Sequence, residues 1–180
     1  MNIYVASSWR NAYQPAVVEV LRDCGHEVYD FRNPADGDRG FAWSALDPAW
    51  QEWTPEQYIG FLDDHRAVDG FLKDYRAMDG ADVCVLVLPC GRSAHIEAGW
   101  FVGARKPLLI FYPEILRLEP ELMYKLAHGV VTTSHALVMR LVEIERAWGG
   151  DEVPHLCVTC GAASPECLAT CVDMKNWVPK

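Results

Sequence analysis

The sequence predicts an α/β protein with a doubly wound, five-stranded parallel sheet of the flavodoxin or Rossmann-like type, followed by a small cysteine-rich appendage. Short apolar runs alternate with amphipathic segments of helical period along residues 1–148. The central run, Val83 to Leu88, is apolar throughout and is bounded by Asp82 and Pro89. Such a run is typical of a strand that is buried on both faces of a parallel sheet.

The elements follow in the order that this fold requires. The predicted strands are residues 2–6, 27–31, 83–88, 107–112 and 129–132. The predicted helices are residues 11–24, residues 54–78 with a break near 68–70, a helix capped by Ser93, and residues 121–127 and 134–148. We expect Thr54, which precedes Pro55, and Ser134 to cap their helices. Together these elements predict the strand order 2-1-3-4-5.

Composition limits the class of partner. The chain has 180 residues, of which 51% are hydrophobic and 23% charged, which suits one well-buried domain with a small appendage. A net charge of -9 argues against a nucleic-acid polymer or an anionic membrane as the main partner. The first residues lack the features of a signal peptide, and no apolar run reaches the length of a membrane span. We therefore expect a cytoplasmic protein that acts on a small molecule.

The stretch after the central strand carries the main candidate residue. Gly91 to Ser93 predicts a tight turn into a helix, with Ser93 as the N-cap and Glu97 in the first turn. Ligands bind at this edge of an open α/β sheet, and the helix dipole favours an ionised carboxylate there, as a nucleophile requires. Glutamate is also common in first turns without any catalytic role. Gly99 and Gly103 lie on one helical face and predict a close approach of this helix to the sheet.

Two further segments carry candidate substrate contacts. Ser7, Ser8, Trp9 and Arg10 lie between the first strand and the first helix, where hydroxyls, backbone N–H groups and a guanidinium could hold a phosphate or carboxylate. A simple helix cap with a solvated arginine explains the same residues. Trp43 belongs to a loop that is rich in aromatic residues. Such a loop either covers a nucleobase or anchors itself on the core.

Four cysteines crowd the C-terminal residues 155–180, beyond a predicted linker at 149–154. The candidate zinc ligands are Cys157, Cys160, Cys167 and Cys171, with His155 as a substitute for one of them. A CxxC step followed by glycine suits tetrahedral zinc, and four thiolates leave no open position, so the zinc would be structural. Redox-active or unpaired thiols are the alternative. We expect no cofactor for catalysis.

The chain resembles a known superfamily in a small set of motifs. These motifs are Ile3-Tyr4-Val5-Ala6, Asp74 ahead of Ala81-Asp82, Ser93-Ala-His95-Ile-Glu97-Ala-Gly99, and Lys106-Pro107. On these residues it resembles the nucleoside 2-deoxyribosyltransferase superfamily, which includes the 2′-deoxynucleoside 5′-phosphate N-hydrolases, over roughly residues 2–146. Asp74 alone, on an amphipathic helix, would be taken for a solvated side chain.

The resemblance implies roles for three residues. Glu97 would be the nucleophile at C1′ of the sugar, Asp74 would handle the proton on the departing base, and the Tyr4 hydroxyl would hold the Glu97 carboxylate. It also implies a homo-oligomer in which neighbouring chains complete the pocket. Arg92, Ser93 and His95 stand where the family often has acidic or glycine residues. They could contact a phosphate or another sugar substituent, and His95 could equally be structural.

These observations predict cleavage or exchange of the N-glycosidic bond of a (deoxy)nucleoside or its 5′-monophosphate. Two alternatives stay open at this point. One is a non-catalytic nucleotide-sensing or interaction module that uses the same pocket. The other is an NAD-type dinucleotide glycohydrolase, which the Glu-x-Gly step and the following Lys-Pro make less favourable.

Overall fold

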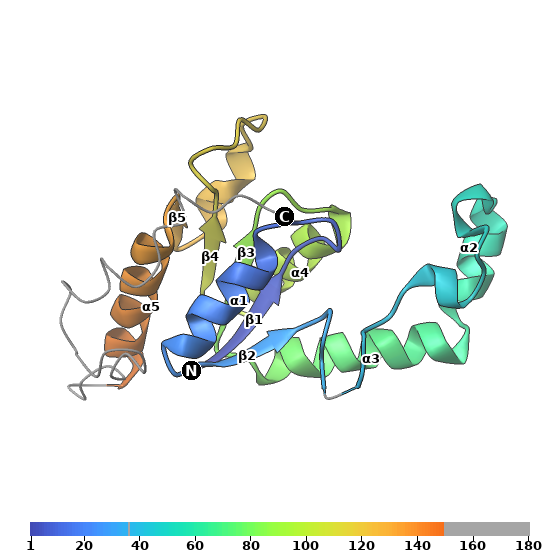
Figure 1. The fold of residues 1–180 in the computed structure, drawn as a ribbon, viewed down its shortest axis with the longest axis horizontal. Coiled ribbons are helices and arrows are strands. Elements are labelled where there is room, and N and C mark those ends of the chain that lie inside the picture. The colour runs from blue at the N-terminus through green and yellow to red at the C-terminus, as the bar shows by residue number, and fades with distance from the viewer. Residues whose placement is uncertain (36, 150–180) are drawn as a thin grey trace.

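A computed structural model describes residues 1–35 and 37–149 of the chain. Its centre is a sheet of parallel strands in the order β2-β1-β3-β4-β5, as predicted (Figure 1). The strands are β1 (Asn2–Ala6), β2 (Glu27–Asp30), β3 (Val83–Val87), β4 (Leu108–Phe111) and β5 (Gly129–Val131). The direction of winding reverses between β1 and β3, and the crevice at such a reversal is the usual ligand site of this architecture.

Helices cover both faces of the sheet. The helices are α1 (Gln14–Asp23), α2 (Pro55–Leu62), α3 (His65–Gly80), α4 (Arg92–Gly103) and α5 (Ser134–Gly149), and the 3-10 turns are η1 (Trp43–Ala45), η2 (Trp50–Glu52) and η3 (Leu122–Leu126). Figure 1 shows α1 and α5 in front of the sheet, with α3 and α4 on the other side. No helix among the described residues is both long and apolar enough to cross a membrane.

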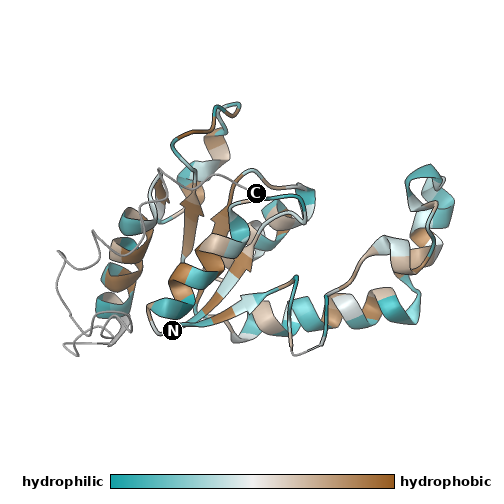
Figure 2. Cartoon of the chain, in the orientation of Figure 1, coloured by the Kyte–Doolittle hydropathy of each residue, from teal (hydrophilic) through white to brown (hydrophobic). Residues whose placement is uncertain are grey.

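The period-two alternation of the strands divides the core into two layers. The face under α1 and α5 is aliphatic, and the strands contribute Ile3, Val5, Val83, Val85, Val87, Leu109 and Phe111 to it. The face under α3 and α4 holds the alternate residues, Tyr4, Ala6, Cys84, Leu86, Leu108 and Ile110. Figure 2 shows the central strands as mostly hydrophobic, and the helices around them with hydrophobic and hydrophilic residues in alternation. Only the second layer carries a tyrosine and a cysteine within the strands.

The break in the long predicted helix is not where we expected it. It lies at Asp63 and Asp64, not near residues 68–70, because the Asp64 side chain caps α3 by accepting a hydrogen bond from the Arg66 N–H at 2.9 Å. Gly70 lies inside α3 for a different reason. A Cβ at that position would stand 2.7 Å from the Cβ of Phe41, so glycine allows the preceding loop to pack on the helix. The predicted Thr54 cap is confirmed, as part of a capping box.

Two predicted helix caps were wrong, and one predicted helix is a short 3-10 helix. α4 begins at Arg92 with Gly91 at the N-cap, so Ser93 is not the cap and Glu97 lies in the second turn. The cap of α5 is formed by Thr133, whose hydroxyl accepts from the Ala136 N–H at 3.2 Å, not by Ser134. The predicted helix at 121–127 is the 3-10 turn η3.

The close approach expected from Gly99 and Gly103 was also wrong. Both glycines are exposed, and a Cβ at either position would meet open space. The small residues that face the sheet are instead Ala94 and Ala98, which are buried beside Phe101. The cysteine-rich tail at 155–180, with the predicted zinc ligands, lies outside the described residues.

Candidate functional site

Three of the predicted residues come together on the face of the sheet under α3 and α4. Tyr4 is fully buried in β1, with its ring between those of Tyr29 and Phe101 at centroid distances of 5.4 and 5.7 Å. Glu97 projects from the second turn of α4, and Asp74 from the middle of α3. The charge of Glu97 acts on Tyr4, and the charge of Asp74 acts on both Tyr4 and Glu97. The fold therefore assembles two carboxyls and a phenol from three separate elements.

Glu97 is held in a low-polarity environment. Burial raises the pKa of its carboxyl to about 7, with a further contribution from the negative charge of Asp74. The nearby Tyr4 hydroxyl acts in the opposite direction. The position in the second turn, one turn further from the helix N-terminus than predicted, leaves burial as the dominant influence. With a pKa near 7, this carboxyl is present in both protonation states at neutral pH.

Asp74 has a hydrogen-bond partner that the sequence did not reveal. The Tyr29 hydroxyl donates to Asp74 Oδ1 at 2.7 Å. Burial raises the pKa of Asp74, and this hydrogen bond partly offsets the effect. Tyr29 pairs in register with Tyr4 on the neighbouring strand, so both tyrosines lie on one face. That shared face, with tyrosine at both paired positions, is the signal that could have found Tyr29.

The Tyr4 hydroxyl is a buried donor without a partner of standard hydrogen-bond geometry among the described residues. It still lies close enough to Glu97 to lower the pKa of that carboxyl. Burial and the adjacent carboxyls raise the pKa of the phenol far above its ordinary value, so it stays protonated. An unpartnered buried hydroxyl costs free energy, and its position beside Glu97 makes it a ready donor to an ionised carboxylate.

The loop between β1 and α1 is fastened to the end of β3. The Ser7 hydroxyl and the Asn11 side-chain amide both donate to the Val87 carbonyl, at 2.9 Å each, and Asn11 also donates to Pro89 O at 3.0 Å. The Ser7 hydroxyl is therefore engaged with the backbone. These bonds fix the segment that leads into α4 and Glu97.

The remaining predicted residues of this loop are more accessible. Trp9 is 48% exposed and packs edge-on against Phe31 at a centroid distance of 5.3 Å. Ser8 accepts the Arg10 N–H with its hydroxyl, and the Arg10 side chain is exposed. Arg32, which the sequence did not single out, donates to the carbonyl oxygens of Ser8 and Asn11. Arg32 thus stabilises the backbone of the loop, and Trp9 and Arg10 remain at the surface of the loop.

The start of α4 presents Arg92 and Ser93 to solvent in its first turn. His95 is exposed, yet both ring nitrogens are engaged. Its Nδ1 donates to Gly91 O at 2.9 Å, because a carbonyl can only accept, and its Nε2 lies 3.0 Å from the Tyr124 hydroxyl. These contacts favour the structural interpretation of His95.

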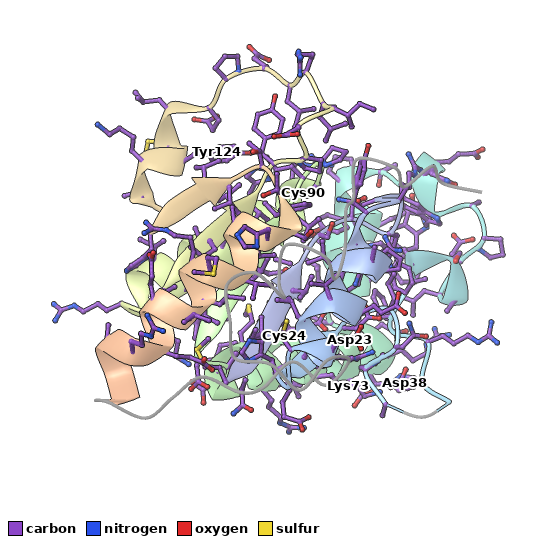
Figure 3. The ribbon with its side chains drawn as sticks, turned by 60° about the vertical axis from the view of Figure 1, so that its left-hand side comes forward. Asp23, Cys24, Asp38, Lys73, Cys90 and Tyr124 are labelled. Carbon is purple, nitrogen blue, oxygen red and sulfur yellow. The ribbon has the colours of Figure 1, made fainter. Side chains whose placement is uncertain are left out.

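Tyr124 and Cys90 complete this side of the site, and neither was predicted. The Cys90 sulfur lies 3.6 Å from His95 Nδ1. Burial and the charge of Glu97 raise the pKa of Cys90 to about 12, so the group is a neutral thiol near Glu97. Figure 3 shows Cys90 and Tyr124 near each other at one edge of the sheet. No sequence pattern links η3 to α4, so this contact depends on the fold.

The described structure does not place Trp43 next to Glu97. Its ring packs against Phe41, Trp53 and Tyr58 at centroid distances of 4.9, 5.6 and 5.8 Å. In Figure 1, α2 stands at the far end of α3, beyond the edge of the sheet. The aromatic loop therefore anchors α2 instead of packing on the sheet core, and a contact between Trp43 and substrate stays a prediction.

A cavity borders Asp74. It has a volume of about 370 Å³ and lies between α3 and the loop after β2. Its lining is Tyr29, Pro34, Asp38, Gly40, Phe41, His65, Arg66, Asp69, Gly70, Lys73 and Asp74. Along one wall, Lys73 Nζ forms ion pairs with Asp38 Oδ2 at 3.1 Å and Asp69 Oδ2 at 3.0 Å. Figure 3 shows Lys73 beside Asp38.

Among residues 1–35 and 37–149, no group of three or more histidine, cysteine, aspartate or glutamate side chains could hold a metal ion. The arrangement that the described residues do provide is a pair of coupled carboxyls with two tyrosine hydroxyls. Such a pair can carry out nucleophilic attack and proton transfer.

No protein-family model matches the chain, and a search of curated proteins also gave no match. Among solved structures, the chain is similar to a 2-deoxyribosyltransferase from the psychrotolerant bacterium Bacillus psychrosaccharolyticus. The two share 20% sequence identity and a TM-score of 0.51, over 75% of this chain and 88% of that chain. It is also similar to the CMP N-glycosidase BcmB of Clostridium botulinum, with 15% identity and a TM-score of 0.42, over 77% and 96% of the two chains. The first likeness confirms the predicted fold.

Proposed function

We propose that this protein cleaves or exchanges the N-glycosidic bond of a (deoxy)nucleoside or nucleoside 5′-monophosphate through a glycosyl ester on Glu97. The observation that carries the proposal is the buried Glu97 carboxyl, with a pKa of about 7, coupled to Asp74 beside a protonated Tyr4. The fold shared with a 2-deoxyribosyltransferase supports the same chemistry. The sequence motifs around Glu97 and Lys106 add to that support.

In the first step, ionised Glu97 attacks C1′ as the bond between C1′ and the base nitrogen breaks. The two coupled carboxyls share one proton near neutral pH, and the reactive form is the one with that proton on Asp74 and Glu97 ionised. The bonding electron pair leaves with the base, and Asp74 gives that base its proton. The transition state resembles an oxocarbenium ion, which a close carboxylate stabilises. The Tyr4 hydroxyl donates to the Glu97 carboxylate and keeps it in position for attack. The product is an ester between the sugar and Glu97.

In the second step, water or a second base attacks C1′ of the ester, and Glu97 leaves as a carboxylate. Asp74, now ionised, takes the proton of the attacking group. Two displacements at C1′ retain the configuration of the sugar. Whether water or a base completes the cycle decides between a hydrolase and a transferase.

The cavity beside Asp74 is where we place the leaving base. Asp74 contributes to its wall, so a base held there would lie near the proton that it must receive. The opposite end of the substrate would face the start of α4 and the loop after β1. Arg10, Arg92 and Ser93 are exposed there and would favour a 5′-phosphate. The Ser7 hydroxyl already donates a hydrogen bond to the Val87 carbonyl and would contribute less to phosphate binding.

A second copy of the chain is part of the proposal. Exposed apolar side chains follow α2 and the outer part of α3, namely Tyr58, Ile59, Leu62, Val68 and Phe71. An exposed apolar surface of this kind is typical of an interface. We expect a homo-oligomer, which light scattering during size-exclusion chromatography would detect. A monomer at all protein concentrations would remove this part of the proposal.

The test is chromatography of reactions with a panel of ribo- and deoxyribonucleosides and their 5′-monophosphates, with and without a free acceptor base. Base release without acceptor would identify a hydrolase, and a new nucleoside only with acceptor would identify a transferase. Glu97→Gln should abolish either product while the protein keeps its fold. A binding module would instead show no turnover, and Glu97→Gln would keep most of its ligand affinity.

A further inference from the structure

Lys106 lies where the two helices that carry the carboxyls meet. Its ammonium group donates to three backbone carbonyls at the C-terminal end of α3: those of Met78 at 3.3 Å, Ala81 at 2.8 Å and Asp79. The three donors of an ammonium match three convergent acceptors, and the negative end of the helix dipole favours a cation there. Met78 is one turn beyond Asp74 on the same helix. The contact therefore fixes the part of α3 next to Asp74.

The same lysine is held firmly by α4. The chain ends α4 with a Schellman motif, in which the Lys106 N–H donates to Phe101 O at 2.9 Å and the Arg105 N–H donates to Val102 O at 3.0 Å. Arg105 has a φ of 59°, in the left-handed region where glycine is usual at this position. Lys106 also lies over the rings of Trp100 and Phe101, at 5.5 and 5.9 Å from their centroids.

Phe101 connects this contact to the site. Its ring packs against the Tyr4 ring in the layer beneath Glu97. A chain of contacts thus runs from the end of α3, through Lys106, to α4 and the phenol of Tyr4. The buried side chains of α3 are only Ala67 and Met78. A direct ring contact also joins α3 to α4, between Tyr75 and Trp100 at a centroid distance of 5.9 Å, but Tyr75 is partly exposed.

We propose that Lys106 is a positioning residue, which sets the separation of Asp74 and Glu97 by fastening the C-terminal end of α3 to α4. It touches neither carboxyl, and it acts through the orientation of the helices. The kinetic consequence rests on the function proposed above. The geometric consequence does not, because the two carboxyls influence each other whether or not a substrate turns over.

Loss of the Lys106 contacts should lower the pKa of Glu97. The groups that face Glu97 are Asp74 on α3, Tyr4 on β1, Tyr29 on β2, Cys84 on β3 and Cys90 on the loop after β3. Loosening α3 would move Asp74 away and let water approach Glu97. Both changes favour the ionised form, so the pKa of Glu97 would fall.

The experiment is a pH titration of the Glu97 carboxyl by NMR, in protein labelled with ¹³C at the glutamate carboxyl and with the signal assigned through Glu97→Gln. Lys106→Met keeps the stem over the two rings but removes the charge and the donors. We expect its Glu97 midpoint to fall by about half a pH unit or more relative to the native chain. An unchanged midpoint would overturn the proposal.

Arg140→Met is the matched control. Arg140 also donates to a backbone carbonyl, His128 O at 2.8 Å, but it lies on α5 at the other side of the sheet. Its removal should leave the Glu97 midpoint unchanged, and an equal fall in both variants would show a general loosening and overturn the specific role. If Lys106→Met does not fold, Lys106→Arg decides. It keeps the charge, but its planar donors cannot converge on three carbonyls, so the midpoint should fall by less and in the same direction.

Turnover gives a second readout once a substrate is known. Lys106→Met should lower kcat about tenfold, with KM changed much less, and should shift the acidic limb of the pH profile to lower pH. Lys106→Arg should recover part of the loss. If the native protein acts on no nucleoside or nucleotide, the proposed function fails, whereas the NMR result still decides the role of Lys106.

Discussion

The two faces of the sheet use the same strands for different purposes. The face under α1 and α5 receives Val83, Val85 and Val87 from β3 and is closed by aliphatic side chains. The opposite face receives Cys84 and Leu86 from the same strand, together with Tyr4 from β1, and two carboxyls lie above it. The first face stabilises the fold, and the second holds the polar groups at a cost in stability. The difference predicts which substitutions change activity and which change only stability.

The largest expected effect is on turnover, and it separates the two faces directly. Glu97→Gln removes the proposed nucleophile and should lower kcat by about 10³-fold or more while the fold is kept. The matched control is Glu145→Gln on α5, where the native carboxylate contacts the N-terminal amine at 3.4 Å. The control should keep kcat within about twofold, because Glu145 lies on the opposite face. Comparable losses in both variants would contradict the assignment, as would an active Glu97→Gln.

The next effect is on stability, and its sign depends on pH. Folding raises the pKa of Glu97 from 4.5 to about 7, so the native state binds the proton more tightly than the unfolded chain does. The carboxyl therefore lowers stability as pH rises between those two values. Glu97→Gln should gain about 3 kcal/mol relative to the native chain at pH 8, and none at pH 4. Urea unfolding at the two pH values measures this, and a gain that does not depend on pH would disprove the raised pKa.

Tyr4→Phe should have a smaller effect on catalysis. It removes the buried hydroxyl beside Glu97, so kcat should fall about tenfold and the acidic limb of the pH profile should move to higher pH. Stability should hold, because the lost hydroxyl has no standard hydrogen-bond partner. Val5→Ala, on the aliphatic face of the same strand, is the contrast. It should lower stability by about 2 kcal/mol and leave kcat per folded molecule unchanged, and the opposite pattern would refute the division between faces.

The smallest expected effect tests the cavity beside Asp74. Gly70→Ala places a methyl group 2.7 Å from Phe41 Cβ, so the loop after β2 must shift away from α3. If that cavity holds the base, KM should rise a few-fold with little change in kcat. Gly99→Ala is the control on α4, because its added methyl meets open space. Steady-state kinetics with the preferred substrate decides, and unchanged KM in Gly70→Ala would place the base elsewhere.

Much of the fold followed from local pattern. The apolar run after Asp82, the Thr54-Pro55 helix start and the order of elements were sufficient to predict the strand order, because each rests on neighbours in sequence. Two start signals were misjudged. Gly91 precedes α4 where Ser93 was expected, and Asp64 restarts α3 where a break near Gly70 was expected. In both places a small or acidic residue offered a competing cap.

The candidate site was predictable only in part. Glu97, Asp74 and Tyr4 were singled out by motif, and the structure brings them together. Tyr29 and Tyr124 were missed because their contacts join segments far apart in sequence, to Asp74 and to His95. The raised pKa of Glu97 was likewise hidden, since burial depends on how α3 and α4 pack. Local sequence therefore indicated the reacting groups, and tertiary packing determined their environment.

The most direct test of the central claim is to identify the covalent intermediate. Enzyme in steady state with its preferred nucleoside or nucleotide would be quenched in acid, digested and mapped by mass spectrometry. We predict an added sugar mass on the peptide that contains Glu97, absent in Glu97→Gln and lost when the reaction runs to completion. An unmodified Glu97 peptide, together with undiminished turnover by Glu97→Gln, would contradict the account.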